Sequence, residues 1–131
     1  MLRQTPDSSS AHYNLGFTYY RAGRYADAEA HLARAEALEP ENPFIHLYRG
    51  LVAMRQSKLD VAEREIRHAI DIGPGHAGFH LALGYVLELK GDTGGALRET
   101  QAELVNSPSN AGVLKRAAVL QARVPRVETT R

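Results

Sequence analysis

The chain has 131 residues and a net charge of +1; 44% of its residues are hydrophobic and 24% are charged. This balance is typical of a folded globular chain, and it excludes the strong basic field that draws a protein to nucleic acid or anionic membranes. Cysteine is absent, which excludes disulfides and thiolate chemistry. Because no apolar run approaches the ~20 residues that cross a bilayer and no signal peptide opens the sequence, we expect a cytoplasmic protein without a membrane partner.

Four residue types recur every 34 positions along the sequence. The recurring sets are Gly16, Gly50 and Gly84; Ala28, Ala62 and Ala96; Pro40, Pro74 and Pro108; and His12, His46 and His80. A period of this length without insertions is typical of stacked helical repeats, in which each unit buries its apolar face against its neighbours. We therefore predict an all-α fold, an α-solenoid of three tandem helix–turn–helix repeats followed by a C-terminal capping helix, with seven helices in total.

The period divides the sequence into six segments. In chain order they are a flexible N-terminal lead (1–8), repeat 1 (9–42), repeat 2 (43–76), repeat 3 (77–110), a capping helix or half repeat (111–124) and a disordered tail (125–131). Helical periodicity predicts helices over about 11–22, 25–38, 43–55, 59–72, 77–89, 94–105 and 111–123. Each pair is joined by a tight turn, and a proline marks the link to the next pair.

Capping residues support these boundaries. The hydroxyls of Ser8 to Ser10 precede the first helix, and Asn42 precedes Pro43, which suits the first position of a helix. Asn110 offers the same kind of cap to the seventh helix. Gly23 supplies the left-handed conformation that ends the first helix.

The spacing of apolar residues assigns the inward faces of two helices. On the helix over 25–38 the inward residues are Ala28, Leu32, Ala35 and Leu38. On the seventh helix they are Val113, Leu114, Ala117, Ala118 and Leu120, with Lys115, Arg116 and Arg123 outward. The sixth helix should be the softest element: Gly94 and Gly95 each cost ~1 kcal/mol of helix propensity relative to alanine. Thr100 and Glu103 also place polar atoms on its apolar stripe.

The repeated residues resemble the tetratricopeptide repeat family over about residues 9–123. That unit favours an aromatic, leucine, glycine and tyrosine on its first helix, then alanine, a large apolar residue, alanine and proline around its second. Repeat 1 matches with His12, Leu15, Gly16, Tyr19, Ala28, Leu32, Ala35 and Pro40. The resemblance implies a non-catalytic protein–protein interaction scaffold whose concave groove is lined mainly by the first helix of each repeat.

Carried over to this sequence, the resemblance predicts an apolar, aromatic groove. Its residues are Tyr13, Phe17, Tyr20, Arg21, Phe44, Leu47, Tyr48, Leu51, Met54, Arg55, Leu81, Tyr85, Glu88 and Leu89. Two interpretations stay open for the aromatic residues: they pack against a neighbouring helix, or they stay exposed and bind. Such a groove suits an amphipathic helix or a peptide with apolar anchors, so we expect a protein or peptide partner and no nucleic acid.

Some family members hold a peptide's terminal carboxylate with lysine and asparagine on these helices. The matching places here hold Tyr13, Phe17, Tyr48, Gly78 and Ala82, so this carboxylate clamp is absent. That absence argues against the C-terminal tails of chaperones as ligands. Two alternatives to a self-contained scaffold stay open: a recognition arm or fragment of a larger enzyme or multiprotein machine, and weak self-association through the terminal helices.

No catalytic or metal site is predicted. The sequence lacks a nucleophile–base pair, a phosphate-binding loop and a known metal-binding helix motif, so we expect no enzyme activity and no cofactor. The histidines in register are interpreted as substitutes for a packing aromatic, because no cysteine or close carboxylate completes a tetrahedral set. Arg49 stands where the repeat expects a buried leucine, so its guanidinium must reach solvent or pair with an acid.

Overall fold

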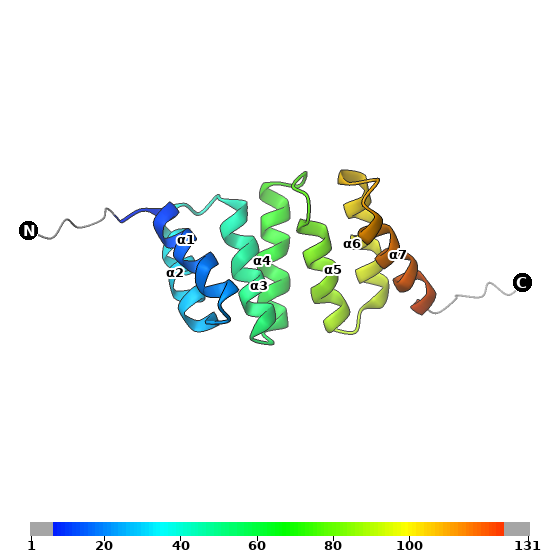
Figure 1. Ribbon diagram of the computed structural model, residues 1–131, viewed down its shortest axis with the longest axis horizontal. Helices are drawn as coiled ribbons and strands as arrows, with labels where there is room; N and C mark the ends of the chain where they lie inside the picture. Colours follow the sequence, from blue (N-terminus) through cyan, green and yellow to red (C-terminus); the bar gives the residue numbers. More distant parts are fainter. Residues whose placement is uncertain (1–6, 125–131) are drawn as a thin grey trace, which may run out of the picture. The chain divides into compact units, whose positions relative to one another are not determined.

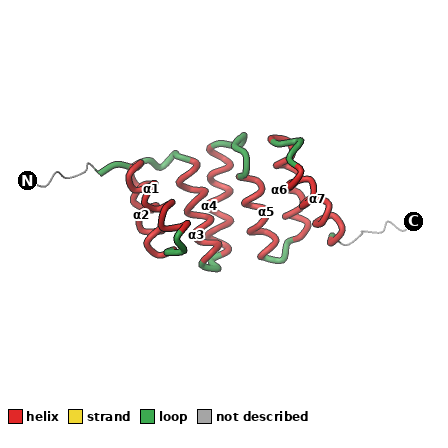
Figure 2. Tube along the Cα trace, viewed as in Figure 1, coloured by secondary structure: helices red, strands yellow, loops and turns green. Residues whose placement is uncertain are grey.

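The computed structural model describes residues 7–124, and within them it contains seven α-helices and no strand (Figures 1 and 2). The helices belong to two compact units that divide between Pro74 and Gly75. The expected all-α class, with helices paired in tandem and a seventh at the end, is confirmed. Most of the predicted lead and all of the predicted tail lie outside the described residues. No helix in the described part is long and apolar enough to cross a membrane.

Unit 1 contains two helix pairs. The first pair is α1 (Ser9–Arg21) and α2 (Tyr25–Leu38), and the second is α3 (Pro43–Arg55) and α4 (Leu59–Ile72). The Ser8 hydroxyl accepts a hydrogen bond from the Ala11 amide, and the Asn42 side chain accepts one from the Phe44 amide. These caps satisfy amide groups that the first turn of a helix leaves without a partner, which fixes where α1 and α3 begin.

The turn inside each helix pair places one residue in the left-handed region. Gly23 has φ +80°, Ser57 has φ +62° and Gly91 has φ +87°, and these three positions are one period apart. Glycine adopts this conformation without steric cost, whereas a residue with a Cβ does not. The tight turn is therefore a property of the repeat, and repeat 2 makes it with an unfavourable residue.

The repeated glycines lie where paired helices touch. A Cβ at Gly50 would stand 2.5 Å from Cγ1 of Ile66 and 3.1 Å from the Ala62 carbonyl oxygen. In the first pair the equivalent contact is between α1 and α2, and Ala28, Leu32 and Ala35 of α2 are fully buried. The sequence-based expectation for Leu38 was wrong: its side chain is 40% exposed, because it lies at the last position of α2, where α2 leaves its neighbours.

Unit 2 contains α5 (Phe79–Leu89), α6 (Thr93–Asn106) and α7 (Ala111–Arg123). Helix α5 begins two residues later than the sequence predicts, because Gly78 before it is left-handed with φ +92°. Gly78 has no side chain that can cap, and the carboxylate of Glu103 on α6 replaces it. Glu103 accepts hydrogen bonds from the Gly78 amide at 2.7 Å and the Leu81 amide at 3.4 Å.

The polar residues on the apolar stripe of α6 have partners. Thr100 is fully buried, and its hydroxyl donates a hydrogen bond to the Ala96 carbonyl at 2.8 Å. The side chain of Glu103 on α6 is 98% buried, and its carboxylate lies against the start of α5. Asp92 caps α6 by accepting from the Gly95 amide, and a Cβ at Gly95 would stand 2.3 Å from that carboxylate. Of these polar groups, Glu103 joins α6 to the start of α5, whereas Thr100 and Asp92 bond within α6. The expected softness of α6 stays a prediction.

Helix α7 packs on α6 and follows the Asn110 cap, as expected. Val113 and Leu120 are buried, but Leu114 is 48% exposed and Ala118 is also exposed, which corrects their predicted inward placement. Arg116 was expected to point outward; its side chain is only 20% exposed. In the described part of unit 2, α7 buries a narrower stripe than the sequence predicts because only α6 and the edge of α5 cover it.

Candidate functional site

An aromatic cluster joins α1 to α3 in unit 1. The ring of Tyr48 on α3 lies 5.9 Å from Tyr13, 5.1 Å from Phe17 and 5.8 Å from Tyr20, in edge-to-face arrangements with Tyr13 and Phe17. All four rings are half-buried. Burial raises the pKa of the Tyr48 and Tyr13 phenols, so both are neutral at physiological pH. Each of these aromatic residues therefore packs on a neighbouring helix and still keeps part of its surface exposed, so both interpretations hold in part.

The other predicted groove residues of unit 1 differ in exposure. Arg21 lies over the Phe17 ring at 5.7 Å, and Arg55 hydrogen-bonds Tyr20; both arginines are exposed. Phe44 is 40% exposed, whereas Leu47 is 92% buried and so offers almost no surface to a ligand. Leu51 and Met54 are half-buried.

Unit 2 contains a cleft of about 420 Å³ between α5 and α7. The predicted groove residues Leu81, Tyr85 and Glu88 form its α5 wall. The α7 side and the residues before it contribute Asn110, Gly112, Val113, Lys115, Arg116, Val119, Leu120 and Arg123. The cleft thus combines apolar walls with three basic side chains and one acid. Leu89, also predicted for the groove, is 60% exposed and does not line it.

Two arginines of α7 converge on α5. The guanidinium of Arg116 lies 3.9 Å from the centre of the Tyr85 ring and forms an ion pair with Glu88. Arg123 contacts the other oxygen of the same carboxylate at 2.6 Å. Burial tends to raise the pKa of Glu88, but the hydrogen bonds and charges of Arg116 and then Arg123 outweigh it and hold that pKa below its usual value. Glu88 is therefore ionised and neutralises only part of the positive charge.

Sequence reasoning missed the contribution of α7 to this site. From the sequence, the seventh helix is a capping helix or a half repeat, and Lys115, Arg116 and Arg123 are expected to point outward. The period contained the missing signal: Lys115 and Val119 lie one period after Leu81 and Tyr85, which were assigned to the groove. Extending the 34-residue spacing one step further would have found them.

Arg49 is held by two acids of α2. Its guanidinium binds Glu29 through Nε and Nη2 at 3.2 and 2.5 Å, and Glu36 through Nη1 at 2.5 Å. Burial alone would lower the pKa of Arg49, but these two hydrogen-bonded carboxylates outweigh it and raise that pKa. The predicted pairing with an acid is therefore what the structure contains, and it ties α3 to the preceding helix pair.

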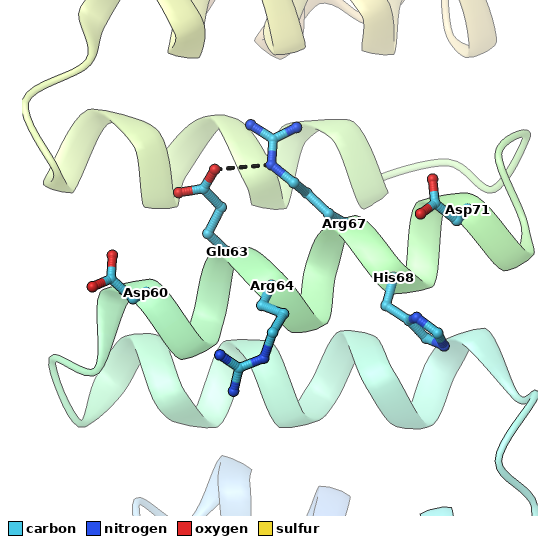
Figure 3. A pocket seen from close by; sticks show the side chains of 6 residues that line it. All are labelled: Asp60, Glu63, Arg64, Arg67, His68 and Asp71. Carbon is cyan, nitrogen blue, oxygen red and sulfur yellow. Dashed lines mark hydrogen bonds and ion pairs between the residues drawn. The ribbon is translucent and has the colours of Figure 1, made fainter.

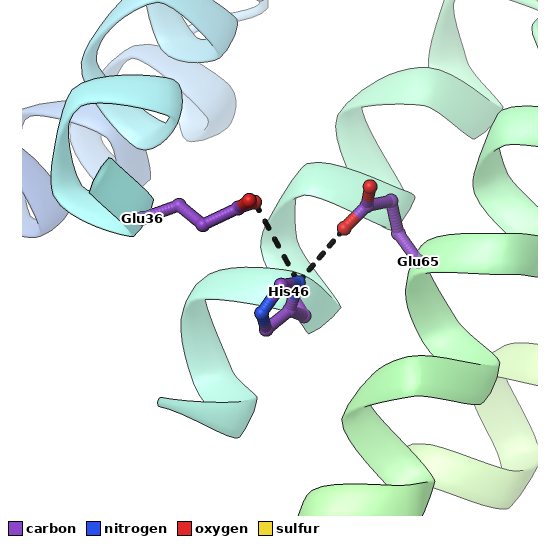
Figure 4. Close-up of side chains that lie close together, drawn as sticks. All are labelled: Glu36, His46 and Glu65. Carbon is purple, nitrogen blue, oxygen red and sulfur yellow. Dashed lines mark hydrogen bonds and ion pairs between the residues drawn. The ribbon is translucent and has the colours of Figure 1, made fainter. Parts of the chain in front are cut away.

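The histidines in register link the helices of a pair. Nδ1 of His12 is 3.1 Å from Nδ1 of His31, and Nδ1 of His80 is 2.8 Å from Glu99. Nδ1 of His46 is 2.9 Å from Glu65 and 3.6 Å from Glu36 (Figure 4). The sequence argument that no carboxylate lies close to these histidines was therefore wrong, because the acids come from other helices.

A further surface hollow of about 430 Å³ follows one side of α4. Asp60, Glu63, Arg64, Arg67, His68 and Asp71 line it, and all come from the same helix (Figure 3). Glu63 and Arg67 pair at 2.8 Å, and the hollow contains three acids and two arginines, so acids and bases compensate each other along the helix. Such a mixed surface is typical of a solvated helix face.

Helix–turn–helix pairs that repeat every 34 residues define this chain as a helical repeat protein. Residues 9–42 and 47–111 each match a family model described as tetratricopeptide repeat, and together they cover well over half of the chain. The chain belongs to the tetratricopeptide repeat family.

Relatives and solved structures agree with this assignment. The chain is 35% identical over 77 residues to the TPR repeat-containing protein PA4667 of Pseudomonas aeruginosa, a match that covers 58% of this chain but only 13% of that protein. It is similar to the Arabidopsis OM64 TPR domain, with a TM-score of 0.84 and 18% identity over 89% of this chain and 97% of that one. The first TPR of Spaghetti (RPAP3), bound to the HSP90 peptide SRMEEVD, has a TM-score of 0.83 and 17% identity over 88% and 94%. At these identities the structural likeness establishes the fold alone.

Proposed function

We propose that this chain is a non-catalytic protein–protein interaction module, and that it binds a peptide or amphipathic helix in the cleft between α5 and α7. Domains of this family are protein-interaction modules, and their fold is typically non-catalytic. The solved structure of the RPAP3 domain holds a peptide, which supports the same type of ligand here. The absence of the lysine and asparagine clamp argues for a different way of holding that ligand.

The observation that carries the proposal is the α5–α7 cleft with Tyr85 at its wall. The Tyr85 ring is 43% exposed although a guanidinium already covers one face, and Val119 across the cleft is 46% exposed. A peptide side chain inserted between them would bury apolar surface. Such burial contributes about 25 cal/mol of favourable free energy per Å². Exposed apolar surface rimmed by charge is typical of interaction sites.

The charges of the cleft favour particular residues next to the anchor, which is the apolar side chain that the peptide inserts. Lys115, Arg116 and Arg123 face one acid, Glu88, so the cleft keeps an excess of positive charge. A peptide with aspartate or glutamate next to a large apolar residue would complement it, since opposite potentials favour encounter and orientation. In this proposal the aromatic cluster of unit 1 has a structural part, because Tyr13 and Phe17 pack on Tyr48.

Selection from a displayed library of random peptides tests the proposal. We expect enriched peptides to share a large apolar residue beside acidic residues, and to bind the Tyr85→Ala, Val119→Ser double variant at least about tenfold more weakly, since hot-spot truncations cost more than about 1.4 kcal/mol. Val105→Ser is the matched control, because Val105 is 81% exposed on α6 and lies outside the cleft. Enrichment of no peptide, or equal binding by the double variant, would contradict the proposal.

A further inference from the structure

Three side chains that can ligate a divalent cation converge in unit 1. Glu36 comes from α2, His46 from α3 and Glu65 from α4, and their ligand atoms all lie within 4.8 Å of one another (Figure 4). Nδ1 of His46 is 2.9 Å from Oε1 of Glu65 and 3.6 Å from Oε1 of Glu36. Two ligands of a tetrahedral zinc ion, each bonded at about 2.0–2.1 Å, stand roughly 3.3 Å apart, so these distances bracket the spacing that zinc requires.

The second nitrogen of His46 is oriented as in a metal ligand. Nε2 lies 2.8 Å from the Pro40 carbonyl oxygen, which can only accept, so Nε2 carries a hydrogen and donates it. This bond fixes the ring so that Nδ1 faces the two carboxylates. Metal-binding histidines commonly donate their other ring N–H to a backbone carbonyl in this way, and metal-binding carboxylates are hydrogen-bonded in turn. Arg49 supplies that second contact to Glu36.

The cluster carries a net negative charge when His46 is neutral. Glu29, Glu36 and Glu65 contribute three negative charges, and Arg49 contributes one positive charge. The side chains of Glu65 and Glu36 are only 15% and 29% exposed, and that of His46 is 7% exposed. Partly buried carboxylates at this spacing repel one another unless a cation lies between them. A divalent ion beside a neutral imidazole balances the charge.

A solvent path reaches the cluster. A narrow cleft of about 120 Å³ is lined by Glu29, Arg49, Ala53, Gln56, Lys58, Val61 and Glu65, so it opens onto one of the three ligands and onto the arginine behind another. A plausible metal site needs suitable ligands, spacing, supporting hydrogen bonds and an entry path. This cluster has all four.

We propose that Nδ1 of His46 and the carboxylates of Glu36 and Glu65 form a Zn²⁺ site, with water completing the tetrahedron. Because the ligands come from three helices, the ion would join α2 of the first helix pair to α3 and α4 of the second. Binding of an ion by the folded chain alone stabilises it by mass action. The site shares no residue with the peptide-binding cleft of unit 2, so either proposal can fail without the other.

The rest of the chain offers close internal controls. His80 and Glu99 repeat the His46–Glu65 contact one period later, but the residue one period after Glu36 in the sequence is Ile70, and the described residues offer no third ligand atom beside that pair. The ring of His68 lies 4.3 Å from the ring of His46 and yet contributes no ligand atom to the cluster. His80→Gln therefore removes an imidazole from the equivalent position of the next repeat, and His68→Gln removes one that lies next to His46. Both variants leave the three ligands intact.

The test is calorimetric titration of chelator-treated full chain with ZnCl₂, together with thermal unfolding with and without Zn²⁺. The expected result is one saturable site in the wild type, the His68→Gln variant and the His80→Gln variant, and a higher Tm with the ion. His46→Gln and Glu65→Gln should bind Zn²⁺ more than about tenfold more weakly, since even outer-shell partners are worth about 10–100-fold. Visible absorption of Co²⁺ in the same proteins gives a second readout of four-coordinate ligation.

Several results would overturn the proposal. They are no saturable binding by the wild type, unchanged binding by His46→Gln, or loss of binding in His80→Gln instead. No binding by the wild type would mean that a proton on His46, rather than an ion, supplies the positive charge, and the other two results would place the ion at a different site. Circular dichroism shows whether each variant folds; if His46→Gln does not, Glu36→Gln replaces it, because Glu36 is the most exposed of the three ligands.

Discussion

Nδ1 of His46 lies 2.9 Å from Oε1 of Glu65, nineteen residues further along the chain, and the contact recurs between His80 and Glu99 at 2.8 Å. In repeat 1 the same spacing joins His12 to His31 at 3.1 Å. The repeated histidine thus links the first helix of each pair to the second. The sequence predicts that this histidine replaces a packing aromatic. In the structure its Nδ1 lies beside a glutamate in repeats 2 and 3 and beside a second histidine in repeat 1.

A double-mutant cycle on His80 and Glu99 measures the value of this link. Both side chains are about 20% exposed, so the contact is partly screened. We expect His80→Ala and Glu99→Ala each to lower the free energy of unfolding, with a coupling energy of about 0.5–2 kcal/mol in urea denaturation. Additive effects of the two substitutions would mean that the contact contributes nothing to stability.

Ser57→Gly should stabilise the chain. Ser57 has φ +62°, in a turn whose equivalents in the other repeats are Gly23 and Gly91. The left-handed conformation costs a residue with a Cβ about 1–2 kcal/mol. Glycine avoids this cost, but it loses more conformational entropy when the chain folds, which offsets part of the gain. We expect a gain of roughly 0.5–1 kcal/mol by chemical denaturation. Gly91→Ser is the reverse control and should destabilise; a loss of stability in Ser57→Gly would show that the serine side chain stabilises the turn.

Alanine at two repeated glycines should have different effects. At Gly50 a Cβ would meet Cγ1 of Ile66 at 2.5 Å, whereas at Gly84 its nearest neighbour is the Thr100 hydroxyl at 3.2 Å. Overpacking costs about 1–3 kcal/mol, and alanine regains ~1 kcal/mol of helix propensity. Gly50→Ala should therefore lower the Tm clearly, and Gly84→Ala should be nearly neutral. Equal effects would show that the α3–α4 contact can widen as easily as the α5–α6 contact.

The contribution of Glu88 should depend on pH. Its pKa in the folded chain is lowered below the ordinary value of 4.5, so its stabilisation is present above about pH 4.5 and is lost as the pH falls through the folded pKa. We expect Glu88→Gln to cost on the order of 1 kcal/mol at pH 7 and progressively less in acid. The exposed Glu41 provides the control Glu41→Gln, which should change stability little at either pH. A cost that stays constant down to pH 3 would mean that Glu88 acts through packing.

Much of the fold could be predicted because the period and the capping residues are local signals. Helices α2, α3, α4 and α7 begin and end at the expected residues, and Asn42, Asn110 and Gly23 act as predicted. The start of α5 was less predictable, since its cap is Glu103 from another helix rather than a neighbouring side chain.

The groove was predicted less well, because exposure depends on which helices surround a residue. Leu47 fits the groove in the repeat pattern and yet is buried, whereas Leu38 and Leu114 fit the core and yet are exposed. Arg116 fits a solvated face, but a long side chain on α7 can reach Tyr85 and Glu88 on α5. Contacts of this kind join residues about 30 positions apart and leave no local signal.

The central claim is that the α5–α7 cleft binds an acidic peptide with an apolar anchor, and titration of ¹⁵N-labelled chain with the tightest peptide from the display selection tests it most directly. The account predicts that the largest amide shifts occur at Tyr85, Arg116 and Val119, and that they disappear when the apolar anchor of the peptide is replaced by serine. Shifts concentrated in α1–α4, with the amides of α5 and α7 unchanged, would contradict it.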